Sequence, residues 1–319
     1  MRTTSVIRIE RTGAPAVLQL AEAGVGAPGP GQVRLRQEAI GVNFVDTMVR
    51  SGIYPMPLPA VPGFEGAGVV EAVGPGVGLE PGRRVAYYFA AGAYAGERLV
   101  DAAALVPLPD DIDTTRAAAF LAKGLTAWMG LRALYRLQPG QTVLVQGASG
   151  NVGAILSRWA RALGATVIGV AGSAARLDKV RQGAQHALAA DDPEVMARLA
   201  ALAPGGVDVV FDFVGQAVSG LTLAALRDGG AIVAIGAASG QPRFDQAELA
   251  RRRIAVHAGG TPQYVTAQNA GDAAAELFQA MRAGWFDDLP IVRHPLAQAV
   301  RVHEDIERRA LDGLAVLIP

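Results

Sequence analysis

The chain has 319 residues, which is long enough for one large domain or two domains of ordinary size. Its 29 Lys and Arg residues balance its 29 Asp and Glu residues and are scattered along the chain, so nothing indicates a basic surface for nucleic acid or an anionic membrane. Cysteine is absent, which excludes disulfides, cysteine-ligated zinc and a thiol nucleophile.

The first residues do not resemble an export signal, because charges are spread through MRTTSVIRIERTG and no apolar core accompanies them. Elsewhere Arg, Asp or Gly interrupts every apolar run before it reaches the ~20 residues that a membrane helix needs. We therefore expect a cytoplasmic protein that acts on a small molecule, with neither nucleic acid nor membrane as a partner.

Residues 1–110 are predicted to be rich in β-strands. Short apolar or alternating runs are separated by Pro- and Gly-rich segments such as GAPGPGQ, which is typical of an antiparallel or barrel-like module. The runs are VIRIERT, AVLQLAEA, QVRLRQEAIGV, GAGVVEAV, RRVAYYF and AYAGERLVDAAALV. The pattern changes at 114–134, where TTRAAAFLAKGLTAWMGLRAL predicts a helix capped by Thr114 or Thr115.

From Thr142 onward, predicted strands and helices alternate. The strand candidates are 142–146, 165–171, 186–190, 207–214, 231–236 and 254–258. Apolar strands in such an alternation indicate a parallel sheet with helices on both faces. Two further helical segments, 268–284 and 295–311, and a final strand, LAVLIP, are too short to make a domain of their own. We therefore expect a first domain of residues 1–120, completed by 261–319, and a second domain of residues 121–260.

The segment from Ala148 to Gly153 has the pattern Ala-x-Gly-x-x-Gly at a strand-to-helix junction. Apolar residues recur at helical spacing through 151–163, and Gly164 is a natural end for this helix. In this context Gly150 lets backbone N–H groups approach a pyrophosphate at the helix N-terminus, and Gly153 lets the helix lie close to the strand. The alternative is a tight connection whose small residues serve packing alone.

The end of the second strand of this unit predicts which coenzyme is bound. Folds that prefer NAD usually place an acid about 20 residues beyond the glycine turn, where it holds the ribose 2′-hydroxyl. Here Ser173 occupies that position and Arg176 follows, and a hydroxyl with a guanidinium favours a 2′-phosphate. We therefore predict NADPH; the alternative is that Arg176 is only a solvated residue of the next helix.

A series of blocks across the whole chain resembles the zinc-independent medium-chain dehydrogenase/reductases, in particular their NADPH:quinone oxidoreductase (zeta-crystallin-like) branch. The blocks are AIGVNFVDTMVRSGIYP (39–55), VPGFEGAGVVEAVGPGV (61–77), KGLTAW (123–128), GASGNVG (147–153), DVVFDFVG (208–215) and GGAIVAIG (229–236). The resemblance implies an α/β fold, in which a GroES-like β-barrel domain is interrupted by a Rossmann domain with a doubly wound parallel sheet. It also implies an active site in the cleft between the domains, and a homodimer.

The same comparison implies that the zinc ligands of related enzymes are missing. Asn43 stands where zinc-using relatives have a Cys ligand, and Phe64 stands where they have a His ligand. Neither an amide nor a phenyl ring can replace the Cys, His or carboxylate ligands that zinc requires. The four His residues of the chain show no ligand spacing, so we expect no metal and assign these residues to the surface or the ordinary core.

The absence of zinc ligands also limits which reactions the chain can catalyse. Alcohol oxidation with NAD(P) needs a Lewis acid or a strong base for the hydroxyl proton, and the chain has no Tyr-x-x-x-Lys to replace zinc. Reduction of a quinone or an α,β-unsaturated carbonyl needs only one or two hydrogen-bond donors for the developing oxyanion. We therefore predict NADPH-dependent reduction of such a substrate. An enoyl-thioester reductase of the same fold and a non-catalytic NADPH-binding protein are the alternatives.

The resemblance also implies roles for single residues. Asn43 would lie beside the nicotinamide and Tyr54 would line the substrate cleft, so either could donate to the oxyanion. The structural alternatives are that Asn43 and Asp46 cap a helix starting near Val45, that Tyr54 fills a turn, and that Lys123 is a solvated helix residue. The expected cofactor-binding residues are Asn43, Lys123, Thr126, Gly150, Asn151, Val152, Gly153, Ser173, Arg176, Val214, Gly236 and Arg309.

Two departures from the family pattern affect parts of this site. Met48 replaces a Tyr that many relatives have, which removes their usual stacking surface for a quinone. Ala190 replaces a Tyr near the adenosine phosphate, so Ser173 and Arg176, helped by Arg309, are left to hold the 2′-phosphate.

Overall fold

The computed structural model describes residues 2–319 and contains two compact units. The first unit comprises the chain up to Ala122 together with Ala267–Ala274 and Leu289–Pro319. The second comprises Lys123–Thr266 and Ala275–Asp288. The second unit therefore contains residues 275–288, which the sequence analysis assigns to the first domain.

Side-chain packing explains why 275–288 group with the second unit. Trp285 and Phe286 lie against Trp159, with ring centroids 6.5 and 5.9 Å away. Asp288 accepts two hydrogen bonds, of 2.7 and 2.5 Å, from the guanidinium of Arg158, which is only 4% exposed. These contacts join residues far apart in sequence, and local periodicity does not report them.

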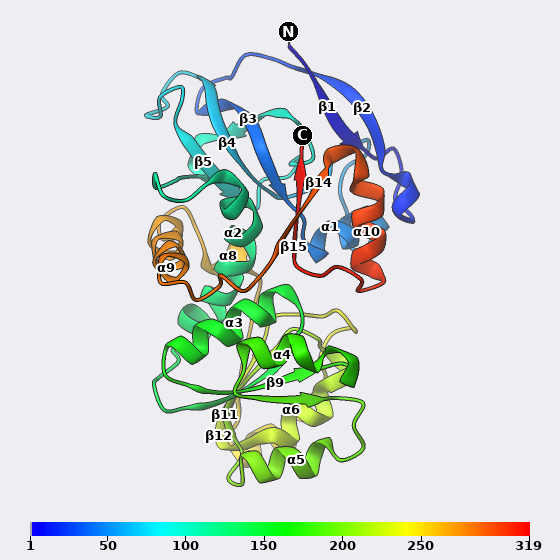
Figure 1. Cartoon of the computed structure of the whole chain (residues 1–319), viewed down its shortest axis with the longest axis vertical. Coiled ribbons are helices and arrows are strands. Elements are labelled where there is room, and N and C mark those ends of the chain that lie inside the picture. Colours follow the sequence, from blue (N-terminus) through cyan, green and yellow to red (C-terminus); the bar gives the residue numbers. More distant parts are fainter. Residues whose placement is uncertain (1) are drawn as a thin grey trace. The chain divides into compact units, whose positions relative to one another are not determined.

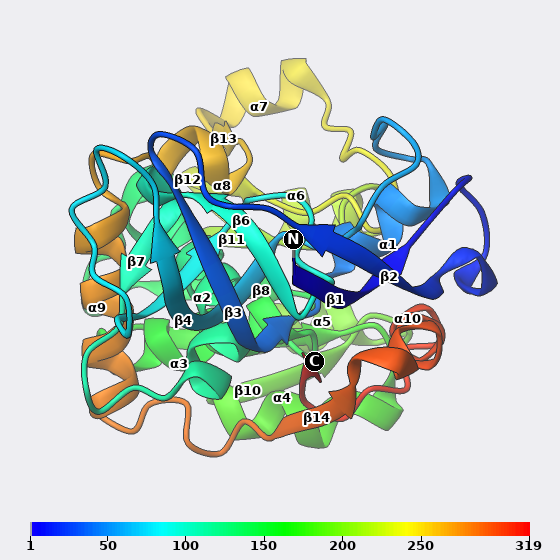
Figure 2. The ribbon, with the colours of Figure 1, turned by 90° about the horizontal axis from the view of Figure 1, so that it is seen from above.

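The first unit is built on a seven-stranded sheet in the order β14-β15-β3-β4-β5-β7, with β6 also paired to β3. The strands are β3 (Gln32–Gly41), β4 (Glu65–Val73), β5 (Arg84–Tyr88), β6 (Glu97–Asp101), β7 (Leu105–Pro107), β14 (Ile291–Pro295) and β15 (Leu314–Ile318). Figure 2 shows β3 and β4 side by side; β14 and β15 are parallel, and the other neighbours are antiparallel. A separate antiparallel pair is formed by β1 (Arg2–Arg8) and β2 (Gln19–Val25). The predicted antiparallel module is confirmed.

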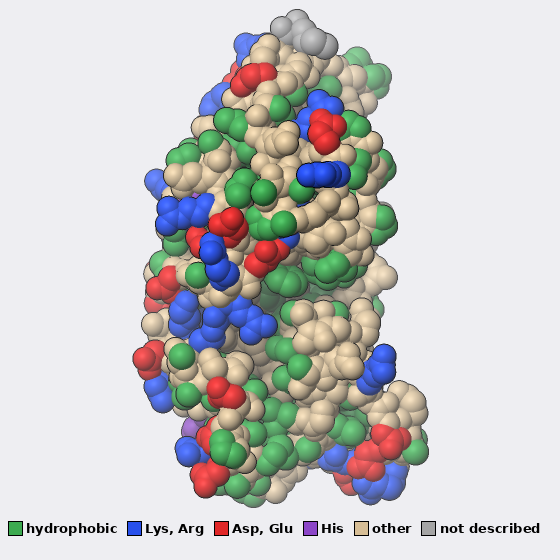
Figure 3. All heavy atoms as spheres, turned by 90° about the vertical axis from the view of Figure 1, so that its right-hand side faces the viewer, with side chains coloured by type: hydrophobic (Ala, Val, Ile, Leu, Met, Phe, Trp, Pro, Cys, Tyr) green, Lys and Arg blue, Asp and Glu red, His purple; other side chains and the backbone are tan. Residues whose placement is uncertain are grey.

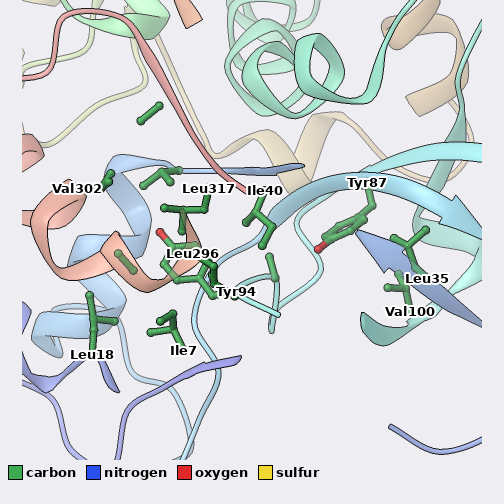
Figure 4. Close-up of a cluster of buried hydrophobic side chains, with 14 of the residues drawn as sticks. Ile7, Leu18, Leu35, Ile40, Tyr87, Tyr94, Val100, Leu296, Val302 and Leu317 are labelled. Carbon is green, nitrogen blue, oxygen red and sulfur yellow. The ribbon is translucent and has the colours of Figure 1, made fainter. Parts of the chain in front are cut away.

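One buried cluster joins this sheet to the C-terminal helix α10 (Ala299–Glu307). Figure 4 shows Leu35 and Ile40 of β3 in the same cluster as Val302 of α10 and Leu317 of β15, and each of these four side chains is fully buried. Tyr94 lies among them, and its hydroxyl has two buried polar partners, Asp46 and His303. The last residues of the described chain are therefore part of the core of the first unit.

The second unit holds a six-stranded sheet in the order β10-β9-β8-β11-β12-β13, and all its neighbouring strands are parallel. The strands are β8 (Thr142–Gln146), β9 (Thr166–Ala171), β10 (His186–Ala189), β11 (Val207–Asp212), β12 (Leu226–Ala234) and β13 (Ala255–Ala258). The chain moves outward from β8 to β10 and then returns to β11 beside β8. The strand order therefore reverses between β8 and β11, which is where open α/β sheets bind ligands, beyond the carboxyl ends of the strands.

Helices cover both faces of this sheet, as the sequence predicts. Figure 1 shows α3 (Asn151–Ala162) and α4 (Leu177–Gly183) on one face and α5 (Val195–Leu202) and α6 (Ser219–Ala225) on the other. The remaining helices are α1 (Phe44–Ser51), α2 (Thr114–Trp128), α7 (Gln246–Arg252), α8 (Thr261–Tyr264) and α9 (Ala270–Arg282). A π-helical segment, Met129–Leu134, follows α2, and short 3-10 turns span Pro15–Val17, Ala102–Ala104, Ala174–Arg176, Gln216–Val218 and Leu296–Gln298.

Two local predictions are wrong. The cap of α2 is Asp113, whose carboxylate accepts the N–H of Arg116 at 2.9 Å, whereas the hydroxyl of Thr114 donates to Glu38 at 2.9 Å. The predicted helix 295–311 is shorter in the structure: Pro295 belongs to β14, Leu296–Gln298 form a 3-10 turn, and α10 spans Ala299–Glu307, ending before Arg309 with its φ of +54°.

Acidic and basic side chains are interspersed on the face shown in Figure 3. Among the helices of residues 2–319, none has the length and apolar character that crossing a bilayer would require.

Candidate functional site

The glycine turn after β8 has the geometry that its sequence predicts. Gly147 adopts a φ of +77°, a conformation that favours glycine, and its N–H donates to Val170 O at 3.0 Å. A Cβ on Gly153 would collide with the carbonyl oxygen of Gly147 and lie 2.9 Å from its carbonyl carbon. Only glycine therefore lets the first turn of α3 pack this closely on the backbone of Gly147 and Ala148. Gly164 ends the helix region with a φ of +87°.

The N-terminus of α3 offers backbone donors at this turn. Gly150 is the N-cap residue, and no side chain caps the helix. Gly150 donates its own N–H to Gly147 O at 2.9 Å, and the first hydrogen bond of the helix runs from the N–H of Ala154 to Gly150 O. The N–H groups of Asn151, Val152 and Gly153 lie before that bond, so they are the donors available to a ligand. Aligned N–H groups and the positive end of the helix dipole favour a phosphate here.

The segments that follow β11 and β12 converge on the same turn. A Cβ added to Gly147 would lie 3.1 Å from a methyl carbon of Val214, so Val214 packs against the turn. Gly236 donates its N–H to Asp212 O at 3.0 Å. A Cβ on Gly236 would collide with the backbone of Phe213. The structure thus brings the predicted residues Val214 and Gly236 to the carboxyl edge of the sheet where the glycine turn lies.

Asp212, which the sequence analysis did not single out, organises this edge. Its side chain is fully buried, and it accepts the N–H groups of Val214 at 2.8 Å and Gly215 at 2.9 Å. Burial raises the pKa of the carboxyl, while these two hydrogen bonds act in the opposite direction. The carboxylate therefore fixes the backbone of the loop that follows β11.

Ser173 and Arg176 share one turn after β9. Ser173 is the N-cap residue of the 3-10 turn Ala174–Arg176, and Arg176 donates its backbone N–H to Ser173 O at 3.1 Å. Both residues are partly buried. Arg309 belongs to the first unit, where it is exposed with a φ of +54° just beyond α10. Its predicted help with the 2′-phosphate stays a prediction.

In the first unit, Asn43 is held by a buried carboxylate. Its amide Nδ2 donates to Glu65 Oε2 at 2.9 Å, and Glu65 Oε1 accepts the N–H of Ala122 at 2.6 Å. Glu65 is fully buried at the start of β4, and a side chain at the facing Gly41 would collide with its carboxylate. The sequence analysis missed Glu65; the available signal is one acid within the apolar and small residues of GFEGAGVV.

The helix-capping alternative for Asn43 and Asp46 is confirmed, because Asn43 is the N-cap residue of α1 and the two residues form a capping box. Helix α1 starts at Phe44, as predicted near Val45, and Asp46 accepts the backbone N–H of Asn43 at 2.9 Å. The Asn43 side chain is directed to Glu65. Asn43 is therefore fixed twice, through its backbone by Asp46 and through its amide by Glu65.

Asp46 is the end of a buried hydrogen-bond chain that reaches α10. The Tyr94 hydroxyl donates to Asp46 at 3.0 Å and lies 2.9 Å from Nε2 of His303. Because the tyrosine proton goes to Asp46, Nε2 of His303 must carry the proton that it donates to the tyrosine oxygen. Burial lowers the pKa of His303 to about 3 and raises that of Tyr94 well above its usual value, so both groups are neutral at pH 7.

Lys123 and Thr126 lie in the last part of α2, which belongs to the second unit. Lys123 is only 3% exposed, so the alternative that it is a solvated helix residue is wrong. The Thr126 hydroxyl lies 2.9 Å from that of Thr261 at the start of α8. Their contact with a coenzyme stays a prediction.

Tyr54 and Met48 lie at the end of α1. Tyr54 donates its backbone N–H to Met48 O at 3.2 Å, beyond Gly52, whose φ of +89° ends the helix. Tyr54 is 44% exposed and Met48 is partly buried. The hydroxyl of Tyr54 is thus within reach of solvent, and its chemical role stays a prediction.

The residues at the two expected zinc-ligand positions have other partners. The Asn43 amide faces Glu65, and the Phe64 ring stacks on Phe89 with centroids 5.4 Å apart and planes inclined by 25°. Within residues 2–319, no three His, Cys, Asp or Glu residues come together in a way that could hold a metal ion. The residues at this position therefore do not fit zinc.

Two hollows adjoin residues already named. One, of about 340 Å³ in the second unit, has an apolar lining that includes Ala190, Met196 and Leu221. The other, of about 370 Å³ in the first unit, is lined by Phe89 and Arg98 among others. The hollow in the second unit is bordered by Ala190, the position where the family resemblance leads one to expect a Tyr.

The chain is similar to known proteins over almost its whole length. Residues 29–110 match the model of the alcohol dehydrogenase GroES-like domain, and residues 151–276 match that of the zinc-binding dehydrogenases. A 2-haloacrylate reductase from Burkholderia sp. is 36% identical over 326 residues, covering 98% of each chain. Quinone oxidoreductase 1 of Escherichia coli is 34% identical over 323 residues, covering 98% of this chain and 99% of that protein.

A solved structure extends the likeness to three dimensions. The crystal structure of Escherichia coli quinone oxidoreductase complexed with NADPH superposes with a TM-score of 0.93 at 34% identity and covers 100% of both chains. The predicted combination of a GroES-like domain and a Rossmann-type parallel sheet is confirmed.

Proposed function

Because the chain belongs to the quinone oxidoreductase family of the medium-chain dehydrogenase/reductases, we propose that it is a metal-independent, NADPH-dependent reductase of quinones or α,β-unsaturated carbonyls. The observation that carries the proposal is the glycine turn of Gly147 to Gly153, which presents an uncapped helix N-terminus at the reversal point of a parallel sheet. The relatives named as quinone oxidoreductase and 2-haloacrylate reductase support this substrate class.

The residues at the carboxyl edge of the sheet suit a dinucleotide. The N–H groups of Asn151, Val152 and Gly153 would hold the pyrophosphate, and Val214 would pack beside it. Ser173 and Arg176 would hold the 2′-phosphate, since no acid stands at that turn to repel it. When bound, NADPH supplies a hydride to the substrate.

Asn43 is the residue best prepared to stabilise negative charge on the substrate. A side-chain amide has two N–H donors, and Glu65 accepts one of them at 2.9 Å. The second N–H remains for a substrate oxygen, and its direction is fixed because Glu65 and Asp46 hold the residue at both ends. A donor fixed in this way stabilises a developing oxyanion without having to reorganise. Tyr54 would supply a second, solvent-accessible donor.

The amide and phenol donors also explain which reaction is excluded. They can stabilise a delocalised oxyanion, but they cannot remove the proton of an unactivated alcohol. The reaction therefore runs as reduction of a conjugated acceptor, and no metal takes part because Asn43 and Phe64 replace the ligands.

The test is a panel assay with the purified full-length chain. NADPH consumption is measured with 1,4-naphthoquinone and with an enone, beside NADP reduction with ethanol and benzyl alcohol, with and without a chelator. We expect turnover of quinone or enone that the chelator leaves unchanged, and little alcohol oxidation. Alcohol oxidation without quinone or enone turnover would overturn the proposal, as would one zinc per chain whose removal abolishes activity. Tight NADPH binding without any turnover would favour a non-catalytic binding protein.

A further inference from the structure

Phe89 is an exposed aromatic residue in a conformation that a phenylalanine rarely adopts. It follows β5 with a φ of +66°, in the left-handed region where a side chain with a Cβ is strained. It is also 47% exposed, one of the few large apolar residues of the chain with so much accessible surface. Strain of this kind persists where the surrounding structure imposes it, and it is frequent at binding sites.

The ring of Phe89 is supported by two other aromatic rings. One of its faces stacks on Phe64 at a centroid distance of 5.4 Å, and Tyr88 meets it edge-on at 5.4 Å with planes inclined by 70°. Ala90 donates its N–H to Phe64 O at 3.2 Å, which ties the segment after β5 to the start of β4. The stack is therefore fixed by backbone as well as ring contacts, and it leaves aromatic surface of Phe89 accessible.

This aromatic pair adjoins the residue proposed to stabilise the oxyanion. Phe64 immediately precedes Glu65, which accepts the Asn43 amide, and Tyr88 is the partner of Glu65 in the β4–β5 ladder. Phe89 also lines the hollow of about 370 Å³, a size within the range of small-molecule pockets. The aromatic stack is therefore joined to the residue that orients the Asn43 amide through the consecutive residues Phe64 and Glu65, and Phe89 borders a hollow on its own side.

We propose that Phe89, stacked on Phe64, is the surface on which this chain binds planar ring substrates, and that it selects two-ring quinones over small open-chain enones. The inference deepens the proposed function and rests on it. It also accounts for Met48, which removes the stacking ring expected on α1, because Phe64 just before β4 and Phe89 just after β5 supply aromatic surface instead. A flat ring gains from offset stacking on a phenyl face, whereas a short enone offers no ring to stack.

The first test measures binding alone. The probe is 2-naphthol, a planar two-ring compound that cannot accept a hydride, titrated into the full-length protein without NADPH. We expect Phe89→Ala to raise its Kd about three- to tenfold, the range that an aromatic pair contributes, and Phe89→Leu to raise it by a smaller factor because apolar contact remains. Leu20→Ala, which removes a 56% exposed apolar side chain on β2, is the matched control and should change nothing.

The second test measures selectivity. Phe89→Ala should lower kcat/KM for 1,4-naphthoquinone by the same three- to tenfold factor, and leave methyl vinyl ketone reduction and the Kd of NADPH unchanged. Equal losses on both substrates, or unchanged 2-naphthol binding, would overturn the inference while leaving the reductase proposal standing. A wild-type protein that turns over neither substrate but binds 2-naphthol through Phe89 would overturn the reductase proposal and keep the binding surface.

Discussion

Substitution of Gly153 by alanine should weaken NADPH binding and lower stability together. The added Cβ would lie 2.9 Å from the carbonyl carbon of Gly147 and 3.0 Å from Cα of Ala148, whereas ordinary contacts begin at 3.4 Å. Both neighbours are backbone atoms, so either the turn or α3 must move. Overpacking of this kind costs about 1–3 kcal/mol of stability. Displacing one N–H from a phosphate removes about 1.5–3 kcal/mol of binding, or about tenfold to a hundredfold in Kd.

Two matched glycines separate this effect from a general loss of helix stability. Gly150 meets only Gly147 O, at 3.3 Å, so Gly150→Ala should hinder the approach of the pyrophosphate with little change in Tm. Gly220 in α6 has nothing within 4 Å, so alanine there should leave NADPH binding unchanged and add about 0.5–1 kcal/mol of stability. The Kd of NADPH is measured by titration, and Tm is measured without coenzyme. Wild-type affinity in Gly153→Ala would refute the assignment of this turn to the phosphates.

Three further predictions concern single side chains. Arg176→Ala should raise the Kd of NADPH about tenfold, the lower end of what a charged hydrogen bond supplies, and leave the Kd of NADH unchanged; equal effects on both coenzymes would contradict it. Tyr54→Phe should lower kcat roughly tenfold rather than a hundredfold, because Tyr54 is 44% exposed and water can replace its hydroxyl; unchanged kcat would leave Asn43 as the only donor. Because burial lowers the pKa of His303 to about 3, the unfolded state binds more protons below pH 6.5, and the free energy of unfolding should fall by about 1.4 kcal/mol per pH unit from there toward 3. Urea denaturation at pH 7 and pH 5 should therefore show a loss of about 2 kcal/mol that is missing in His303→Gln; the same loss in the variant would contradict the role of His303.

The second unit was predictable from sequence because its signals are local. Each strand is a short apolar run, and the glycine turn is defined by residues only three positions apart, Gly147, Gly150 and Gly153. Their conformations follow from steric limits that act within one β-α connection. Sequence patterns did not group residues 275–288 with the second unit, because Arg158 and Asp288, which join them to it, are 130 positions apart.

The active-site neighbourhood of the first unit was predictable only in part. Asn43 and Phe64 were recognised as positions where ligands are missing, but their partners were not. Glu65 reaches Asn43 across 22 positions, and His303 reaches Tyr94 across 209, through a sheet whose strand order periodicity does not determine. The stack of Phe64 on Phe89 likewise depends on the register of β4 against β5.

The most direct test of the account follows the hydrogen itself. NADPH carrying deuterium at C4 of the nicotinamide, prepared separately with each of the two stereochemistries, is incubated with the purified chain and an α,β-unsaturated ketone in ordinary water. We expect one of the two forms to place one deuterium at the β-carbon of the saturated product, and the other to yield product without it. Product without deuterium at that carbon from both forms would contradict hydride transfer by this protein, as would a failure to reduce both this ketone and 1,4-naphthoquinone while NADPH remains bound.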